Sequence, residues 1–211
     1  MSDDEEGYEN DMIKCKITLI GESSVGKTSF IKQYTSNTFN QELQTTIGGE
    51  REYKTLEIND KKVRLAFWDT AGQEKYRSLS RIFINKSNIV IFVYDITKKD
   101  TFEKIKEYWY PTTIQILGNE NVIYGLAANK SDLYENEEVK YDDAVAFANS
   151  IHAIIKETTA MNHKQIEELV FELVKAFLDK GLEEVDQNEN RSKLEVSKTV
   201  NKPKGKEKKC C

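Results

Sequence analysis

Short apolar runs typical of β-strands alternate with helical patterns along most of this chain. The runs cover residues 17–20, 62–68, 89–94 and 121–128. A glycine, two aspartates and an asparagine follow them directly: Gly21, Asp69, Asp95 and Asn129. Helical periodicity appears at 101–106 and most clearly at 166–178. Such alternation predicts a mostly parallel α/β sheet with helices on both faces. Ligands bind beyond the carboxyl ends of such strands, so we expect the functional residues there.

The length and the cysteine usage limit the class of protein. A chain of 211 residues suits one domain with tails, since domains hold about 150 residues. Its longest apolar run, 89–94, is far short of the roughly 20 residues that span a bilayer. Only Cys15 lies in the body of the chain, where we expect a small buried hydrophobe. The other two cysteines are Cys210 and Cys211, which suits a reducing cytosol.

Charge is distributed unevenly around a net value of −5. Residues 1–11 carry six acids and no base, so they do not resemble a secretory signal, and Ser2 excludes N-myristoylation. Between residues 198 and 209 there are six lysines and one acid. An acidic body with a short basic tail makes nucleic acid a poor partner. We expect an acidic disordered N-terminus at 1–11, a domain at 12–180 and a flexible tail at 181–211.

Residues 21–28, Gly-Glu-Ser-Ser-Val-Gly-Lys-Thr, match the phosphate-binding pattern G-x-x-x-x-G-K-[ST] after the first expected strand. Glycines let the backbone wrap phosphate with its N–H groups pointing inward, and the next helix adds its positive end. Lys27 supplies a point charge for the β- and γ-phosphates, and Thr28 a hydroxyl for Mg²⁺. The nucleotide contacts expected here come from Ser23, Ser24, Val25, Gly26, Lys27, Thr28 and Ser29.

Two further motifs follow strands and complete a nucleotide site. In Asn129-Lys130-Ser131-Asp132, the carboxylate of Asp132 can accept two N–H groups of guanine, a donor pair that adenine lacks. The stem of Lys130 can lie on the ring, and Asn129 can tie this loop to the phosphate loop. In residues 68–74, Asp69 can hold Mg²⁺ through water. Gly72 can approach a γ-phosphate, and Gln73 can orient the attacking water.

Together these motifs resemble those of Ras-superfamily small GTPases, and more closely those of Rab proteins. The matching segments are 21–28, 46–48 (Thr-Ile-Gly), 68–74 (Trp-Asp-Thr-Ala-Gly-Gln-Glu), 76–78 (Tyr-Arg-Ser), 94–97 (Tyr-Asp-Ile-Thr), 129–132 and 157–160 (Glu-Thr-Thr-Ala). The resemblance implies a six-stranded, mostly parallel P-loop GTPase domain. It also implies that GTP, GDP and Mg²⁺ are the ligands and that GTP is hydrolysed slowly, with Gln73 and Lys27 catalytic.

The resemblance adds site residues that the strand ends alone do not indicate. Thr46 would bind Mg²⁺ beside Thr28 and Asp69 when the γ-phosphate is present. Phe39 would pack edge-on against the base. Thr159 and Ala160 would line the base pocket, with the backbone N–H of Ala160 donating to the guanine carbonyl.

The end of the chain resembles a Rab lipidation site, with Cys210 and Cys211 as the prenylated residues. Two lipid chains, or one chain with a basic patch, hold a protein on a membrane. The resemblance implies a switch in vesicle traffic on the cytoplasmic face of an intracellular membrane, cycling with the cytosol. Its implied partners are an exchange factor, an activating protein, a prenylation escort, a dissociation inhibitor and effectors that read 46–51 and 68–83.

Some positions depart from the Rab pattern. In Rab proteins an aromatic set of residues signals the state of the protein to effectors, and we call its positions the state-reading positions. The matching residues here are Arg51, Trp68 and Phe83, so Arg51 stands where a Rab has Phe. Residues 102–111 look closer to Rho proteins, but the 24 residues between Asp132 and Glu157 leave no room for the Rho insert.

Two alternative functions stay open. The chain can be a guanine-nucleotide-binding interaction module with little or no hydrolysis, or a phosphotransferase, although it lacks an evident basic lid for an acceptor. His152 and His163 have no second ligand at metal spacing, so we expect surface or packing roles for them.

Overall fold

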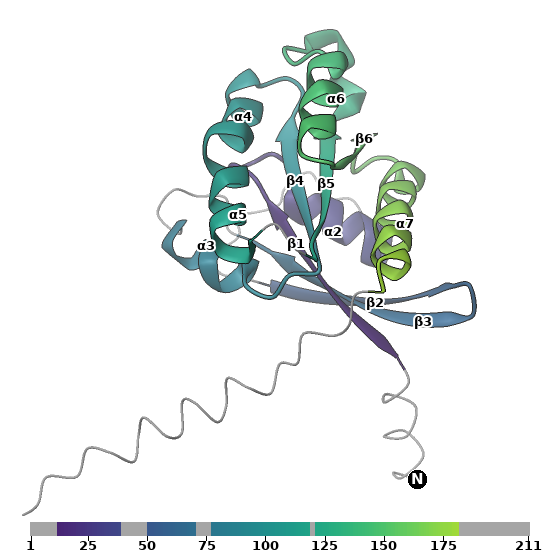
Figure 1. Cartoon of the computed structure of the whole chain (residues 1–211). Helices are drawn as coiled ribbons and strands as arrows, with labels where there is room; N and C mark the ends of the chain where they lie inside the picture. Colours follow the sequence, from purple (N-terminus) through teal and green to yellow (C-terminus); the bar gives the residue numbers. More distant parts are fainter. Residues whose placement is uncertain (1–11, 39–49, 71–76, 119–120, 182–211) are drawn as a thin grey trace, which may run out of the picture.

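The computed structural model describes residues 12–38, 50–70, 77–118 and 121–181, and it places a six-stranded sheet at the centre (Figure 1). The strands lie in the order β2-β3-β1-β4-β5-β6. Neighbours pair in parallel except β2 and β3, which form an antiparallel hairpin. The strands are β1 (Ile13–Ile20), β2 (Glu50–Ile58), β3 (Lys61–Asp69), β4 (Ile89–Asp95), β5 (Ile123–Asn129) and β6 (Ile154–Thr158).

Helices cover both faces of the sheet, as the sequence predicts. One face packs against α2 (Lys27–Ser36) and α7 (His163–Asp179). The other face carries α3 (Arg77–Ile84), α4 (Lys99–Lys104), the π-helical turn η2 (Ile105–Trp109), α5 (Tyr110–Leu117) and α6 (Tyr141–Ser150). A 3₁₀ segment, η3 (Ser131–Asn136), follows β5. Within the described ranges no helix is both long and apolar enough to cross a bilayer.

The four expected strands are confirmed as β1, β3, β4 and β5. Every residue of β4 and β5 is buried, which explains their continuous apolar runs. Burial alternates along β3, because one of its faces packs on the core. Strand β1 begins at Ile13 rather than residue 17, since Lys14 and Lys16 interrupt its apolar pattern.

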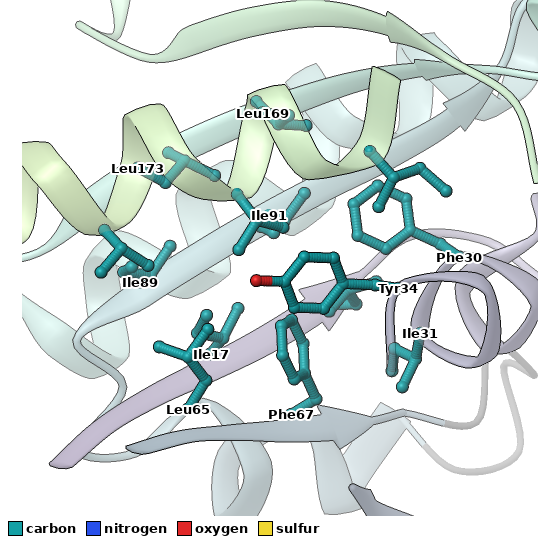
Figure 2. Packing of buried hydrophobic residues seen from close by; sticks show 14 of the residues in the cluster. Ile17, Phe30, Ile31, Tyr34, Leu65, Phe67, Ile89, Ile91, Leu169 and Leu173 are labelled. Carbon is teal, nitrogen blue, oxygen red and sulfur yellow. The ribbon is translucent and has the colours of Figure 1, made fainter. Parts of the chain in front are cut away.

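The core between the sheet and the helices α2 and α7 is built around Tyr34 (Figure 2). Its ring lies 5.2 Å from that of Phe67, centroid to centroid, and it is stacked on His163 at 6.1 Å. The Nδ1 atom of His163 is 2.8 Å from the carbonyl of Gln33, so the packing role expected for this histidine is confirmed. Cys15 is buried in the same cluster, where burial raises the pKa of its thiol.

The expected terminal segments, 1–11 and nearly all of 181–211, lie outside the described residues, so the proposed domain limits stay predictions. The described part of 12–180 contains two hydrophobic clusters, one on each face of the single sheet.

Replacing Phe177 with alanine should destabilise the domain strongly, because its ring is fully buried between α7 and the sheet. Large-to-small core substitutions of this kind lower the free energy of unfolding by about 3–5 kcal/mol. Phe171→Ala is the matched control, since Phe171 lies on the same helix but is 43% exposed, and its loss should be about 1 kcal/mol or less. Urea unfolding in saturating GDP measures both values. Equal losses would contradict the described packing of α7.

Candidate functional site

The parallel strands β1, β3, β4 and β5 end along one edge of the sheet, and the polar residues at those ends come together. Asp95 and Asn129 are direct neighbours in the register of β4 and β5. Gly21 follows β1 and Asp69 ends β3. The edge therefore carries all four of the residues that the sequence marks as strand ends, as expected for the ligand side of a parallel sheet.

The loop from Gly21 to Gly26 is shaped by close backbone contacts that exclude side chains. A Cβ atom at Gly21 would lie 2.1 Å from the carbonyl oxygen of Val93. Gly26 precedes α2 with a φ of 99°, and a Cβ there would lie 2.4 Å from Nδ2 of Asn129. Both positions need glycine, so the two glycines of the sequence motif have a direct structural reason.

Lys27 is buried inside this loop. Its Nζ donates to the carbonyl oxygens of Gly21 at 2.9 Å and Glu22 at 2.7 Å. Burial lowers the pKa of Lys27 to about 8, against the opposing effect of the carboxylates of Asp69 and Glu22. A desolvated ammonium inside this loop is suited to binding an anion, because a phosphate would compensate its charge.

Thr28 and Asp69, two of the residues expected to hold Mg²⁺, are joined by a hydrogen bond. The hydroxyl of Thr28 donates to Oδ2 of Asp69 over 2.5 Å, and Asp69 is only 3% exposed. A hydroxyl and a carboxylate are hard oxygen donors, which Mg²⁺ prefers alongside phosphate oxygens and water. These two residues therefore fit the ion. Elsewhere in the described ranges, no group of three or more His, Cys, Asp or Glu residues converges as a metal site.

Asn129 connects the other side of the site to the phosphate loop. Its Nδ2 donates to the carbonyl oxygen of Val25 at 2.7 Å, and its Oδ1 accepts from the hydroxyl of Thr158 at 3.1 Å. The tie between Asn129 and the phosphate loop that the sequence suggests is present.

The remaining base-reading candidates lie next to Asn129. Asp132 accepts a 2.5 Å hydrogen bond from the hydroxyl of Thr159, which links η3 to the segment after β6. Ala160 follows and is buried. Lys130 forms an ion pair with Asp95, Nζ to Oδ2, at 2.6 Å. The structure thus brings Asn129, Lys130, Asp132, Thr159 and Ala160 together around one end of the sheet.

Asp95 has a role that the sequence reasoning left unassigned. Burial acts to raise its pKa, but hydrogen bonds from Lys130 and Thr97 outweigh burial, and the pKa lies below its ordinary value. The carboxylate stays charged and holds the stem of Lys130 in place. The signal for this pairing was available, since Asp95 follows a buried strand in the same way as Asn129 does.

A second missed residue is Trp109, whose indole N–H donates to Oε1 of Glu22 at 2.9 Å. Trp109 lies in the π-helical turn η2 and is 3% exposed, whereas Glu22 belongs to the phosphate loop. The two residues are 87 positions apart, so no local pattern connects them. π-Helical turns are frequent at functional sites, but they have no simple sequence signal.

Six of the expected site residues lie outside the described residues: Phe39, Thr46, Gly72, Gln73, Cys210 and Cys211. Ser23, Ser24 and Ser29 lie within the phosphate loop and the first turn of α2, as expected. Of the three expected state-reading positions, Arg51 lies over the indole of Trp68, with 3.8 Å from Cζ to the ring centroid. The ring of Phe83 is 6.0 Å from that of Trp68.

Comparison with known proteins agrees with this geometry. Residues 16–179 match the model of the Ras family. Ras-related protein Rab-21 of Bos taurus is 40% identical over 164 residues, which cover 78% of this chain and 73% of the relative. Ras-related protein Rab-22A of Homo sapiens is 38% identical over 158 residues, 75% of this chain and 80% of the relative. Ras-related protein Rab-19 of Homo sapiens is 35% identical over 164 residues, which cover 77% of this chain and 75% of the relative.

The family model covers the phosphate loop, the sheet and the base-reading residues. The glycine-shaped loop, the Thr28–Asp69 pair and the Asn129 tie lie inside that matched region. The chain therefore belongs to the Ras family and is a GTPase of the Rab type.

Proposed function

We propose that this GTPase is a membrane-anchored switch in vesicle traffic, which binds GTP or GDP with Mg²⁺ and hydrolyses GTP slowly. The observation that carries the proposal is the convergence of three groups at one sheet edge. They are the buried cation of Lys27, the Thr28–Asp69 pair and the Asn129–Asp132 segment. A nucleotide needs these three chemistries at one site: a cation for its phosphates, oxygen ligands for the metal ion that the phosphates bind, and polar groups for its base.

Each group has a distinct task in the proposed reaction. Lys27 stabilises the charge on the β- and γ-phosphates, since phosphoryl transfer depends on positioning and charge stabilisation. Thr28 and Asp69, with Thr46, would hold Mg²⁺, which neutralises charge on the phosphate oxygens when bound. Gln73 would orient the attacking water. No arginine of the sequence is an obvious finger in cis, so we expect slow turnover that an activating protein accelerates.

The base end of the site would select guanine. The carboxylate of Asp132 is held by Thr159, and Lys130 is held by Asp95. Both side chains therefore have partners within the protein that fix their orientation, which reduces the ordering that binding requires. Phe39, Thr159 and Ala160 complete the proposed base pocket.

The proposed switch would control the binding of partner proteins, and it would do so on a membrane surface. Loss of the γ-phosphate would release the segments that contain Thr46 and Gln73, and partners that read them would leave. Prenylation of Cys210 and Cys211, helped by the six lysines of the tail, would hold the protein on the cytoplasmic face of an intracellular membrane. An exchange factor, a prenylation escort and a dissociation inhibitor would then control its cycle with the cytosol.

The function is tested by identifying the nucleotide that co-purifies with the full chain and then following phosphate release from GTP with Mg²⁺. Bound GDP with slow phosphate release is the expected result. Bound guanine nucleotide with no release, even with added activating protein, would favour an interaction module that uses the nucleotide as a structural ligand. The absence of guanine nucleotide would overturn the assignment of the base.

Replacing Asp132 with asparagine should change the base preference, because the amide offers one donor where the carboxylate offers only acceptors. Affinity for GDP should fall by at least about a hundredfold, and affinity for xanthosine diphosphate should rise. Competition binding with labelled nucleotides measures both changes. Retained preference for guanine would contradict the role of Asp132.

Replacing Gln73 with leucine should slow hydrolysis by roughly tenfold to a hundredfold, because the attacking water loses its orienting group. Binding of GTP should persist, since the contacts of Lys27 and Asp132 are unchanged. Single-turnover phosphate release, with nucleotide affinity as the control, separates the two effects. Unchanged turnover would remove Gln73 from the proposed mechanism.

Replacing Trp109 with phenylalanine should loosen the phosphate loop, because Glu22 loses the indole donor while the core keeps an aromatic ring. We expect GDP release to accelerate by roughly threefold to tenfold, within the usual range of coupling between contacting residues. The control is the same substitution in a Glu22→Ala background, where it should have little further effect. Fully additive changes in release rate would show that Trp109 does not act through Glu22.

A further inference from the structure

One face of the β2–β3 hairpin and of β1 is rich in cations. In β3, the buried Val63, Leu65 and Phe67 point toward α2 and α7, so the alternate residues lie on the opposite face. The strand register adds their neighbours on β1 and β2. We call this set the cationic face: Lys14, Lys16, Arg51, Tyr53, Glu57, Lys62, Arg64 and Trp68.

The charge of the cationic face is opposite in sign to that of the chain. Five of its side chains are basic and only Glu57 is acidic, whereas the whole chain has a net charge of −5. One pair of cations, Lys16 and Arg51, is also close enough for one to affect the other. The pKa of Lys16 is lowered to about 8, mainly by burial and further by Arg51. An anionic partner would be complementary in sign to this face.

Aromatic rings hold several of these cations in place. The guanidinium of Arg51 and the ammonium of Lys16 lie 3.8 and 4.4 Å from the centroid of the Trp68 ring. Arg64 lies 4.9 Å from the ring of Tyr53. A guanidinium that is already stacked loses less freedom when it binds a carboxylate, and it still presents its planar donors.

Large apolar side chains border the cations. Phe83 of α3 contacts Trp68, and Ile82 beside it is 63% exposed. Tyr53 on the hairpin is 52% exposed. Lys16 donates to the carbonyl of Asn85 at 2.7 Å, which fixes the turn after α3 against β1. The surface therefore combines an exposed arginine with aromatic side chains, and both residue types are enriched in protein interfaces.

We propose that the cationic face binds an acidic protein segment that also carries a large apolar side chain. Arg51 receives its carboxylate, and Trp68 and Phe83 receive its apolar group. The inference rests on the proposed function, because Arg51, Trp68 and Phe83 occupy the positions at which the switch is expected to be read. It adds the chemistry of the partner, which the arginine at position 51 determines.

A protein segment fits this surface better than an anionic membrane does. Arg51 is exposed and already stacked on the indole of Trp68, so it presents its guanidinium to an approaching carboxylate in a fixed orientation. Lipid headgroups in a plane favour protruding flexible lysines instead. Residues 1–11 of this chain also carry six acids shortly before β1. The test therefore includes a synthetic peptide of that segment as an alternative ligand.

The experiment selects peptides from a random library on the full chain, loaded in parallel with GDP and with a non-hydrolysable GTP analogue. We expect enrichment of peptides that combine Asp or Glu with a large apolar residue. The selected peptides are resynthesised, and their dissociation constants are measured by fluorescence anisotropy. Arg51→Glu should weaken binding by about tenfold or more, and added salt should weaken binding to the wild type.

The matched control is Lys175→Glu, which changes the net charge equally on an exposed position of α7, the helix on the opposite face of the sheet. Its effect should be less than about twofold. A selected pool without acidic preference, or equal losses in the two variants, would overturn the proposal. So would binding to phosphatidylserine vesicles that depends on Arg51 while no peptide is selected. If no library peptide binds but a synthetic peptide of residues 1–11 binds in an Arg51-dependent way, the proposal of a separate partner is overturned. The face would then bind the chain's own N-terminus.

The same experiment separates this inference from the proposed function. Loading with labelled GDP is measured first for the wild type. If the protein loads guanine nucleotide but selects no acidic peptide, the result contradicts only the proposal of an acidic partner. A protein that loads no guanine nucleotide contradicts the proposed function itself.

Discussion

The side-chain amide of Asn129 is the contact on which the rest of the site depends. Its Nδ2 donates to the phosphate loop at Val25, and its Oδ1 accepts from Thr158 at the end of β6. One buried residue thereby joins three segments that are distant in sequence. The Nδ2 atom also occupies the space that a Cβ at Gly26 would need, so the glycine and the asparagine require each other. An aspartate at position 129 could not donate to Val25, because a carboxylate only accepts.

Within this frame the charged groups of the site all have polar partners inside the protein. Lys27 donates to two carbonyl groups of its own loop, Thr28 donates to Asp69, and Lys130 pairs with Asp95. Buried charges are tolerated only when they are paired and hydrogen-bonded. Phosphate and metal would replace some of these internal partners instead of entering an apolar cavity.

Much of the fold and of the candidate site follows from local sequence patterns, for physical reasons. The fully buried β4 and β5 have continuous apolar runs, and their ends mark Asp95 and Asn129. Strands β2 and β6 were missed because they lie at the two edges of the sheet, where burial is weaker and the apolar pattern is diluted. The Trp109–Glu22 contact could not be predicted, since it depends on tertiary packing over 87 positions. The cationic face needs the register of three strands, which no single segment encodes.

The cationic face and the nucleotide site are physically close because they share β3. Asp69 points to the side of Thr28, whereas Trp68 points to the side of Arg51, since successive side chains of a strand lie on opposite faces. The same register pairs Glu50 with Asp69 and Arg51 with Trp68. A shift of β3 that changed the distance between Asp69 and Thr28 would therefore also move the indole on which Arg51 and Lys16 are stacked. Trp68 and Asp69 thus place the proposed metal site and the proposed partner surface on opposite faces of one strand, so both depend on the position of β3.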